Sequence, residues 1–171
     1  MATTPSSTLS SALSSTGLSI AREPFDAPDG ARLRAAQRAE LDVRYGSDDH
    51  EPGTPPSAAD VPVFLVARDR DGTALGCGGL RPLEPAVSGV PAVEVKRMFV
   101  VPAARGTGVA VALLRALEEE ARLLGVRRVL LETGTAQPDA VRFYEREGYL
   151  RTEAFGPYRG QPLSVCYARD V

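Results

Sequence analysis

The sequence predicts a single α/β (α+β) domain built on a mixed, twisted β-sheet with flanking helices. Three observations support this prediction: a length of 171 residues, a β-hairpin pattern before the middle of the chain, and a strand–helix–strand pattern after it. A chain of this length suits one domain with a sizeable core. Hairpin strands pair antiparallel, whereas strands joined by a helix pair in parallel with a right-handed crossover. The sheet should therefore contain both kinds of pair.

Composition narrows the classes of partner. The formal net charge is −2, and the basic residues are spread along the chain, so neither nucleic acid nor an anionic membrane is expected to bind. No apolar run approaches the roughly 20 residues that span a bilayer. The one histidine, His50, argues against a Ser-His-Asp triad and against a histidine-based zinc site, and no metal is expected. Cys77 and Cys166 lie in apolar, strand-like contexts and are expected as free buried thiols rather than a disulfide.

The first residues differ in composition from the rest. Residues 1–16 are rich in Ser and Thr and carry no charged side chain, which predicts a disordered tail before a domain over residues 17–171. This segment lacks the basic start and unbroken apolar stretch of a secretory signal. We therefore expect a cytoplasmic protein, with processing or targeting as the other interpretation of the segment.

Local patterns predict the elements of the first half in order. A short strand is expected near residues 18–21, then a helix over 27–45 that ends at Gly46. Residues 47–60 contain three prolines and four carboxylates and should form a mobile loop. Strands over 61–69 and 73–83 flank an Asp-Gly hairpin turn. The expected apolar stripe of the helix is Leu33, Ala36, Ala39 and Val43.

The second half is predicted from alternation and helical spacing. A strand over 92–101 alternates, which would place Val93, Val95, Arg97, Phe99 and Val101 on one face and Glu94, Lys96, Met98 and Val100 on the other. The long helix that follows should bury Ala110, Leu113, Leu114, Leu117, Ala121 and Leu124. Its solvent face should pair Glu118 with Arg122. Gly125 should end it, before a strand over 126–133, a helix over 138–148 and strands over 149–155 and 163–169.

Two glycines, Gly106 and Gly108, immediately precede the long helix. A helix N-terminus has unpaired N–H groups and partial positive charge, and glycines let an anion approach them closely. The segment lacks the Gly-Lys-Ser/Thr of a P-loop, and Val111 stands where a dinucleotide fingerprint needs a small residue. The pattern therefore predicts a phosphate or pyrophosphate cradle, with a plain tight turn as the alternative.

Three segments in order and spacing resemble the GCN5-related N-acetyltransferase (GNAT) superfamily. These are the strand "EVKRMFVVP", the loop "RGTGVA" that begins at Arg105, and the segment "QPDAVRFYEREGY", where the family more often has Asn in place of Gln137 and Phe in place of Tyr149. The resemblance covers about residues 61–169. It implies acetyl-CoA as donor and a fourth strand that splays from the fifth. The implied donor contacts are Met98, Phe99, Val100, Arg105, Gly106, Thr107, Gly108, Val109, Ala110, Gln137 and Tyr144.

The resemblance also implies how the acetyl group moves. Tyr144 matches the family tyrosine whose hydroxyl faces the CoA sulfur, so it is the candidate acid. Glu94, where some members have a base, is the first candidate base, and Glu132 is the second; either could act directly or through water. An ion pair of Glu94 with Lys96 or Arg97, and a structural network around Glu132, are the alternatives.

The acceptor is expected to be a small-molecule primary amine that attacks directly in a ternary complex. A protein N-terminus or lysine is the rival acceptor, and a non-catalytic acyl-CoA sensor or scaffold is the rival class. Asp48, Asp49, His50 and Glu51 could attract an amine, although a solvated acidic loop is favoured. Tyr45 and Tyr158 are expected to line the acceptor pocket. Exposed edge strands are compatible with a homodimer.

Overall fold

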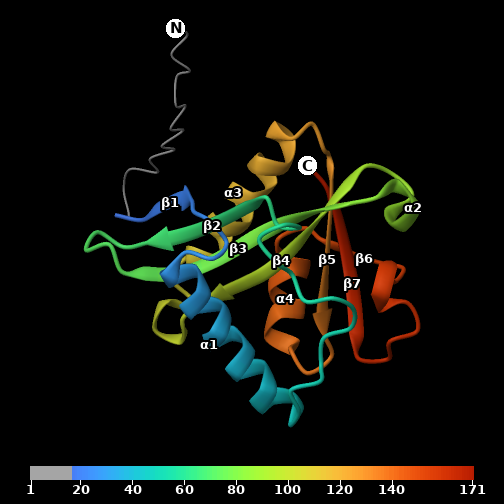
Figure 1. Cartoon of the computed structure of the whole chain (residues 1–171), viewed down its shortest axis with the longest axis horizontal. Helices are drawn as coiled ribbons and strands as arrows, with labels where there is room; N and C mark the ends of the chain where they lie inside the picture. The colour runs from blue at the N-terminus through green and yellow to red at the C-terminus, as the bar shows by residue number, and fades with distance from the viewer. Residues whose placement is uncertain (1–16) are drawn as a thin grey trace, which may run out of the picture.

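Seven strands form one mixed sheet in the order β1-β2-β3-β4-β5-β7-β6 (Figure 1). The computed structural model describes residues 17–171, so the predicted disorder of residues 1–16 lies outside the described residues. The strands are β1 Ser19–Arg22, β2 Val63–Arg68, β3 Ala74–Leu83, β4 Ala92–Val100, β5 Arg128–Gly134, β6 Leu150–Thr152 and β7 Ser164–Asp170. The helices are α1 Pro28–Tyr45, α2 Pro85–Ser88, α3 Val109–Leu123 and α4 Pro138–Arg146.

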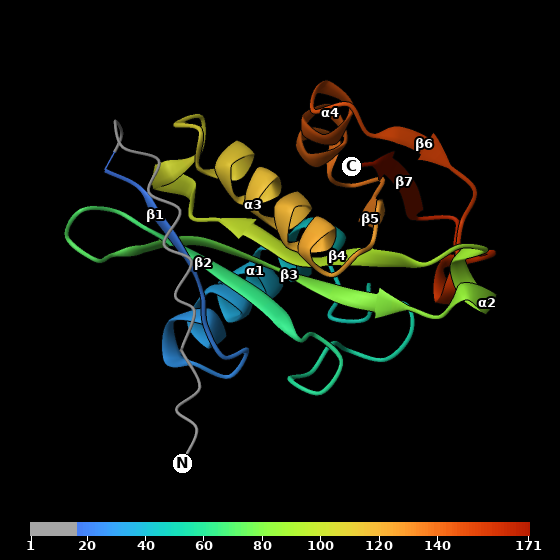
Figure 2. The ribbon, with the colours of Figure 1, turned by 90° about the horizontal axis from the view of Figure 1, so that it is seen from above.

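The predicted mixed sheet is confirmed. β2 and β3 pair antiparallel across the expected hairpin. β4 and β5, which α3 connects in the sequence, pair in parallel. Figure 2 shows α3 and α4 on one face of the sheet and α1 on the other. The larger core lies under α3 and α4, and a smaller one lies under α1. The short helix α2 was not predicted, because its four residues fall in a segment rich in proline and glycine.

The parallel pair is short. Residues Ala92–Val95 of β4 pair with residues Arg128–Leu131 of β5, and the pairing stops there although both strands continue. The expected splay between the two strands is therefore present. Backbone groups on this side of β4 beyond Val95 have no neighbouring strand to pair with.

A β-bulge in β4 corrects the predicted alternation. Arg97 has a φ of 57°, and the register against β3 shifts between Cys77 and Gly79. Such an extra residue reverses the side-chain alternation that follows. Phe99 consequently packs in the α1-side core, whereas Val100 joins Val95 in the α3-side core. The prediction that Phe99 shares a face with Val93 and Val95 is wrong for this reason.

The predicted apolar stripe of α1 is also wrong beyond Leu33. Leu33 is fully buried, but Ala36 and Ala39 are exposed and Val43 is 82% exposed. Only the first turns of α1 pack on the sheet, where Gly30 lies against the ring of Phe64. The rest of the helix presents Gln37, Leu41 and Tyr45 toward the β4–β5 gap, a mixed face that the periodicity of apolar residues does not reveal.

The long helix α3 forms as predicted, except at its polar face. Glu118 is 1% exposed rather than solvated. Its carboxylate accepts hydrogen bonds from Arg115 at 2.7 Å and from Tyr149 and Arg169 at 3.2 Å each. A buried carboxylate needs such partners. Arg122 pairs with Glu119 instead, and Leu124, which was expected in the core, is 45% exposed at the helix end.

Both cysteines are free and buried, as predicted. Burial raises the pKa of the Cys77 thiol to about 12 and that of Cys166 to about 11. Both thiols are therefore neutral at physiological pH, which makes them poor nucleophiles. Over the described residues, no helix has the length and apolar character needed to cross a membrane.

Packing of α3 on the sheet predicts that two leucines of this helix contribute differently to the free energy of unfolding. Leu117 is fully buried, whereas Leu123 is 57% exposed. We expect Leu117→Ala to lower the free energy of unfolding by about 2–5 kcal/mol, and Leu123→Ala to change it by less than about 0.5 kcal/mol. Urea denaturation of both variants measures this. Similar losses in the two variants would contradict the orientation of α3.

Candidate active site

A cavity of about 580 Å³ lies at the gap between β4 and β5. It is lined from both faces of the sheet, because α1 lies on one face and α4 on the other. Its lining residues come from α1, residues 49–53, the bulge of β4, the end of β5, α4 and residues 161–164. The splay of the parallel pair thus creates an opening through the sheet. A place where neighbouring strands of an α/β sheet separate, next to the carboxyl end of a strand, commonly binds a ligand.

Two side chains hold the free edge of β4. Gln37 donates a hydrogen bond from Nε2 to the Met98 carbonyl at 2.9 Å, and Arg105 donates from Nε to the Val100 carbonyl at 3.0 Å. A second guanidinium nitrogen of Arg105 pairs with Glu40 at 2.6 Å. Arg105 therefore ties the loop to β4 and α1. The role of Gln37 was not predicted from the sequence, because its partner lies 61 residues away.

The loop after β4 forms the predicted turn into α3. Gly106 and Gly108 both have positive φ, 76° and 92°, and an added Cβ at either position would meet nothing within 4 Å. The first hydrogen bond of α3 runs from the Ala112 N–H to the Gly108 carbonyl. The N–H groups of Gly108–Val111 therefore lack partners in the helix. These groups form an open, electropositive site suited to an anion.

The other predicted donor contacts lie around this turn and the cavity. Thr107 donates its hydroxyl hydrogen to the Ala104 carbonyl at 2.6 Å, so only its lone pairs remain for a ligand. Val109 is buried and Ala110 half-buried on α3. Met98 lines the cavity, but Phe99 and Val100 do not. Gln137, before α4, lines it and lies 3.4 Å from the Tyr45 hydroxyl.

Glu132 and Tyr144 both line the cavity. Burial raises the pKa of the Glu132 carboxyl, and a hydrogen bond from Ser164 and the charge of Lys96 offset only part of this effect. Burial also raises the pKa of the Tyr144 hydroxyl, and the charge of Glu132 adds to the shift. The cavity therefore holds a carboxylate that is more basic than usual near a tyrosine that stays protonated. These properties suit a proton acceptor and a proton donor.

Glu94 is placed differently from the other candidate base. It is 1% exposed and is not among the cavity-lining residues. Its carboxylate lies 2.8 Å from Arg81 Nη2 and 2.5 Å from the Tyr158 hydroxyl. Lys96 completes the cluster, with Nζ at 2.9 Å from that hydroxyl and 3.5 Å from Glu94. Glu94 thus holds a buried network behind the cavity wall.

Of the two tyrosines expected in the acceptor pocket, one lies there and the other does not. Tyr45 lines the cavity, stacks on His50 at a ring distance of 5.2 Å and has its hydroxyl directly over Gly134. Tyr158 is fully buried in the Glu94 cluster and lies outside the cavity lining, so its expected place was wrong. A side chain at Gly134 would collide with Tyr45, since a Cβ there would lie 1.4 Å from its hydroxyl oxygen.

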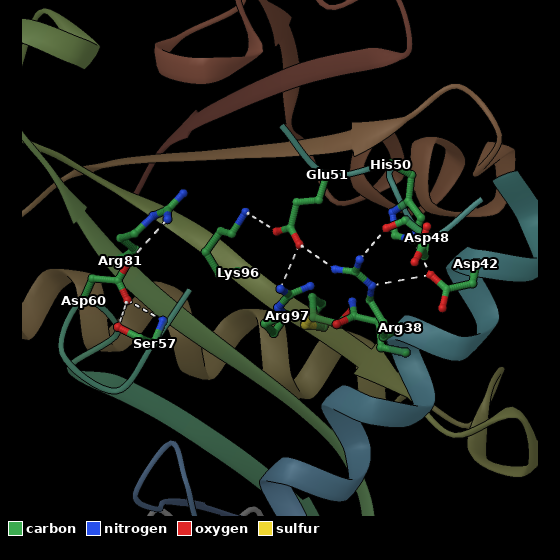
Figure 3. A network of polar contacts seen from close by, with 12 residues as sticks. Arg38, Asp42, Asp48, His50, Glu51, Ser57, Asp60, Arg81, Lys96 and Arg97 are labelled. Carbon is green, nitrogen blue, oxygen red and sulfur yellow. Dashed lines mark hydrogen bonds and ion pairs between the residues drawn. The ribbon is translucent and has the colours of Figure 1, made fainter. Parts of the chain in front are cut away.

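The acidic loop is only partly solvated. Asp48 and Asp49 are exposed, as the favoured interpretation predicted, but Glu51 is turned inward toward Lys96 and Arg97 (Figure 3). His50 donates a hydrogen bond from Nε2 to Asp42 Oδ1 at 2.7 Å. Asp49, His50 and Glu51 therefore form part of the cavity wall. The description as a solvated loop fails for His50, which packs on Tyr45 and Asp42 of the preceding helix, and for Glu51, whose partners Lys96 and Arg97 lie on β4.

Comparison with known proteins identifies the family. The model of the acetyltransferase (GNAT) family matches residues 31–149, a span that includes most of α1, the β4 bulge, the Gly106–Gly108 turn and α4. The chain belongs to this family. It is accordingly an acyltransferase, and the predicted resemblance and fold are confirmed.

Individual acetyltransferases and acyltransferases resemble this chain in sequence or in fold. An IAA acetyltransferase from Azospirillum brasilense is 44% identical over 108 residues, which cover 63% of this chain and 67% of the relative. A crystal structure of a Klebsiella pneumoniae protein assigned to the acyl-CoA N-acyltransferases has a TM-score of 0.74 and 30% identity, covering 91% of this chain and 99% of that one. A GNAT acetyltransferase from Elizabethkingia anophelis, solved with acetyl-CoA bound, shares the fold with a TM-score of 0.65 at 14% identity, and covers 92% and 100% of the two chains.

The raised pKa of Glu132 predicts a pH-dependent effect on stability. Because its folded pKa exceeds the unfolded one, the native state binds more protons in that window, and stability falls as pH rises through it. Glu132→Gln removes this cost. We expect the variant to match wild type at acidic pH and to exceed it in melting temperature as pH rises toward neutral.

Thermal unfolding across pH measures the effect, with Glu119→Gln as a control for removing an exposed carboxylate. A variant that is less stable than wild type at neutral pH would indicate that Glu132 serves a structural ion pair.

Proposed function

We propose that this acyltransferase moves an acetyl group from acetyl-CoA to the primary amine of a small molecule, by direct attack in a ternary complex. The observation that carries the proposal is the cavity at the β4–β5 gap, which contains a carboxyl with a raised pKa and a buried tyrosine. The electropositive turn at Gly106 and Gly108 comes a few residues after the end of β4, one of the two strands that border this cavity. Donor phosphates and reacting groups would thus lie along one continuous edge.

The residues present fit the donor. The free N–H groups of Gly108–Val111 suit a pyrophosphate, and no Cβ occupies the space in front of Gly106 or Gly108. The free edge of β4 beyond Val95 offers backbone groups to an extended chain with amides. Bound acetyl-CoA supplies a thioester whose C–S bond breaks as the new C–N bond forms.

Glu132 and Tyr144 have the properties that the proton transfers require. An alkylammonium has a pKa near 10.4, so the amine must lose a proton before it attacks. A carboxylate in a buried site accepts that proton, directly or through water, more readily than one in solvent. The Tyr144 hydroxyl remains protonated and can donate to the leaving thiolate. We therefore assign the base to Glu132 rather than to Glu94, whose carboxylate is already bound by Arg81 and Tyr158.

The shape of the cavity favours a small acceptor. Residues 49–53 and 161–164 contribute to its wall in addition to the sheet and helices. A protein N-terminus or lysine would have to pass between these segments, whereas a small amine fits within about 580 Å³. Release of CoA thiol from acetyl-CoA in the presence of small amines tests the proposal. Tight acetyl-CoA binding without thiol release for any amine or peptide would support the sensor alternative.

The cradle predicts a specific effect of Gly108→Val on donor binding. A valine side chain would cover the N–H groups of α3, so the variant should lose acetyl-CoA affinity by at least about 100-fold. Gly125→Val is the matched control, because Gly125 also has positive φ, 72°, and open space, but lies at the other end of α3.

Calorimetric titration with acetyl-CoA measures both variants. Both should lose similar stability from the left-handed backbone, about 1–2 kcal/mol. Equal affinity in the two variants would remove the cradle assignment.

Tyr144→Phe isolates the proposed acid. Loss of the hydroxyl should lower kcat by about 10²–10⁴-fold, while the affinity for acetyl-CoA stays within a few-fold of wild type. Tyr167→Phe removes another buried tyrosine hydroxyl, which bonds to Glu145 outside the cavity lining, and should leave kcat nearly unchanged. Steady-state kinetics compare the two. An unchanged kcat in Tyr144→Phe would assign this tyrosine to packing alone.

A further inference from the structure

Three cationic side chains converge on one carboxylate at the cavity wall (Figure 3). The carboxylate belongs to Glu51 in the loop after α1. It lies 2.8 Å from Arg97 Nη2, 3.3 Å from Lys96 Nζ and 3.7 Å from Arg38 Nη1. Lys96 and Arg97 come from the bulged part of β4, and both line the cavity. The cavity therefore contains a binding site for a carboxylate, which the protein fills with its own side chain.

Of the three cations at this site, Arg97 depends most on Glu51 for a counter-charge. Lys96 also faces Glu94 at 3.5 Å, and Arg38 faces Asp42 at 3.4 Å. In contrast, within residues 17–171 the ion pairs of Arg97 involve no carboxylate except that of Glu51. The Arg97 side chain is only 12% exposed, so its charge needs a partner at this position.

The protonation state of Glu51 agrees with this role. Burial opposes its ionisation, but the charges and hydrogen bonds of Lys96 and Arg97 outweigh that effect and hold the pKa of Glu51 below its usual value. The site thus stabilises a negative charge although the Glu51 side chain is only 14% exposed. Another carboxylate of similar size would experience the same attraction.

Few backbone contacts hold Glu51 in place. The described loop contains no helix or strand over residues 46–60, and no backbone–backbone hydrogen bond involves residues 48–56. The nearby contacts are made by side chains, such as His50 on Tyr45 and Asp42. Withdrawal of Glu51 would therefore break few hydrogen bonds other than its own, and such segments open at low cost.

We infer that the acceptor amine carries a carboxylate, which replaces Glu51 between Lys96 and Arg97 while the amine faces Glu132 and Tyr144. This inference rests on the proposed acetyltransferase function and specifies its substrate class as amino acids or related amino carboxylates. An amine without an anionic group would leave Glu51 in place and gain no partner from β4. A polyamine would bring additional positive charge next to Lys96 and Arg97, which disfavours it.

The test compares each amino acid with its own carboxamide as acceptor. Thiol release from acetyl-CoA is measured over a range of pH, so that the different amine pKa values of the two forms can be separated from recognition. For its preferred side chain, wild type should use the acid with a kcat/KM about 10- to 100-fold above that of the amide, the range expected for a charge-assisted hydrogen-bonded pair.

Two substitutions change the site in opposite directions. Glu51→Gln removes the competing charge and should raise kcat/KM for the acid several-fold while changing that of the amide little. Arg97→Gln should bring the ratio of acid to amide close to one. Arg122→Gln, an exposed arginine on α3 outside the cavity lining, is the matched control and should keep the wild-type ratio. Because Arg97→Gln leaves Glu51 with fewer partners, circular dichroism must show that it is folded.

Binding gives a second readout that is independent of turnover. Calorimetric titration of the Glu51→Gln variant in the presence of CoA measures this. N-acetyl amino acids should bind the variant more tightly than the corresponding N-acetyl amino acid amides. Equal use and equal binding of acids and amides would overturn the carboxylate site. If acetyl-CoA still binds and amides are acetylated in that case, the acetyltransferase proposal stands without this substrate class. Absence of acetyl-CoA binding would overturn both.

Discussion

The gap between β4 and β5 is the constraint on which the rest of the site depends. Parallel pairing stops after four residues of each strand, and the remaining edge of β4 is left without a strand partner. A sheet interior normally pairs every backbone group, so this interruption requires other partners. Gln37 and Arg105 supply two of them at the Met98 and Val100 carbonyls. What remains is an opening through the sheet, next to the turn that begins α3.

The bulge at Arg97 sets which side chains face that opening. A non-glycine residue in the left-handed region costs about 1–3 kcal/mol and persists only where its surroundings require it. Here the bulge places Val100 in the α3-side core and Phe99 in the α1-side core, while Lys96 and Arg97 line the cavity. Ion pairs with Glu51 and Glu94 then compensate the two cations. Backbone geometry and cavity electrostatics are thus linked in one strand.

Local patterns predicted the elements well, because turns, helix ends and apolar spacing depend on neighbouring residues. The hairpin, the parallel pair and the Gly106–Gly108 turn follow from such patterns. The errors share another cause. Glu118 is polar yet buried, because Arg169 of β7 binds it in addition to Arg115 of its own helix, and Glu51 sits in an acidic loop yet turns inward, because Lys96 and Arg97 of β4 bind it. Pairings of this kind, like the positive φ of Arg97, depend on the assembled fold and leave no periodic signal in the sequence.

The proposed function requires that the β4 edge and the N-terminus of α3 together form an acetyl-CoA site. Calorimetric titration of the wild-type protein with acetyl-CoA, CoA, ATP and NAD tests it most directly. Acetyl-CoA and CoA should bind with similar affinity, since they share the pyrophosphate and the amide-bearing arm, and ATP and NAD should bind at least tenfold more weakly. Failure of acetyl-CoA to bind, or equal binding of ATP and NAD, would contradict it.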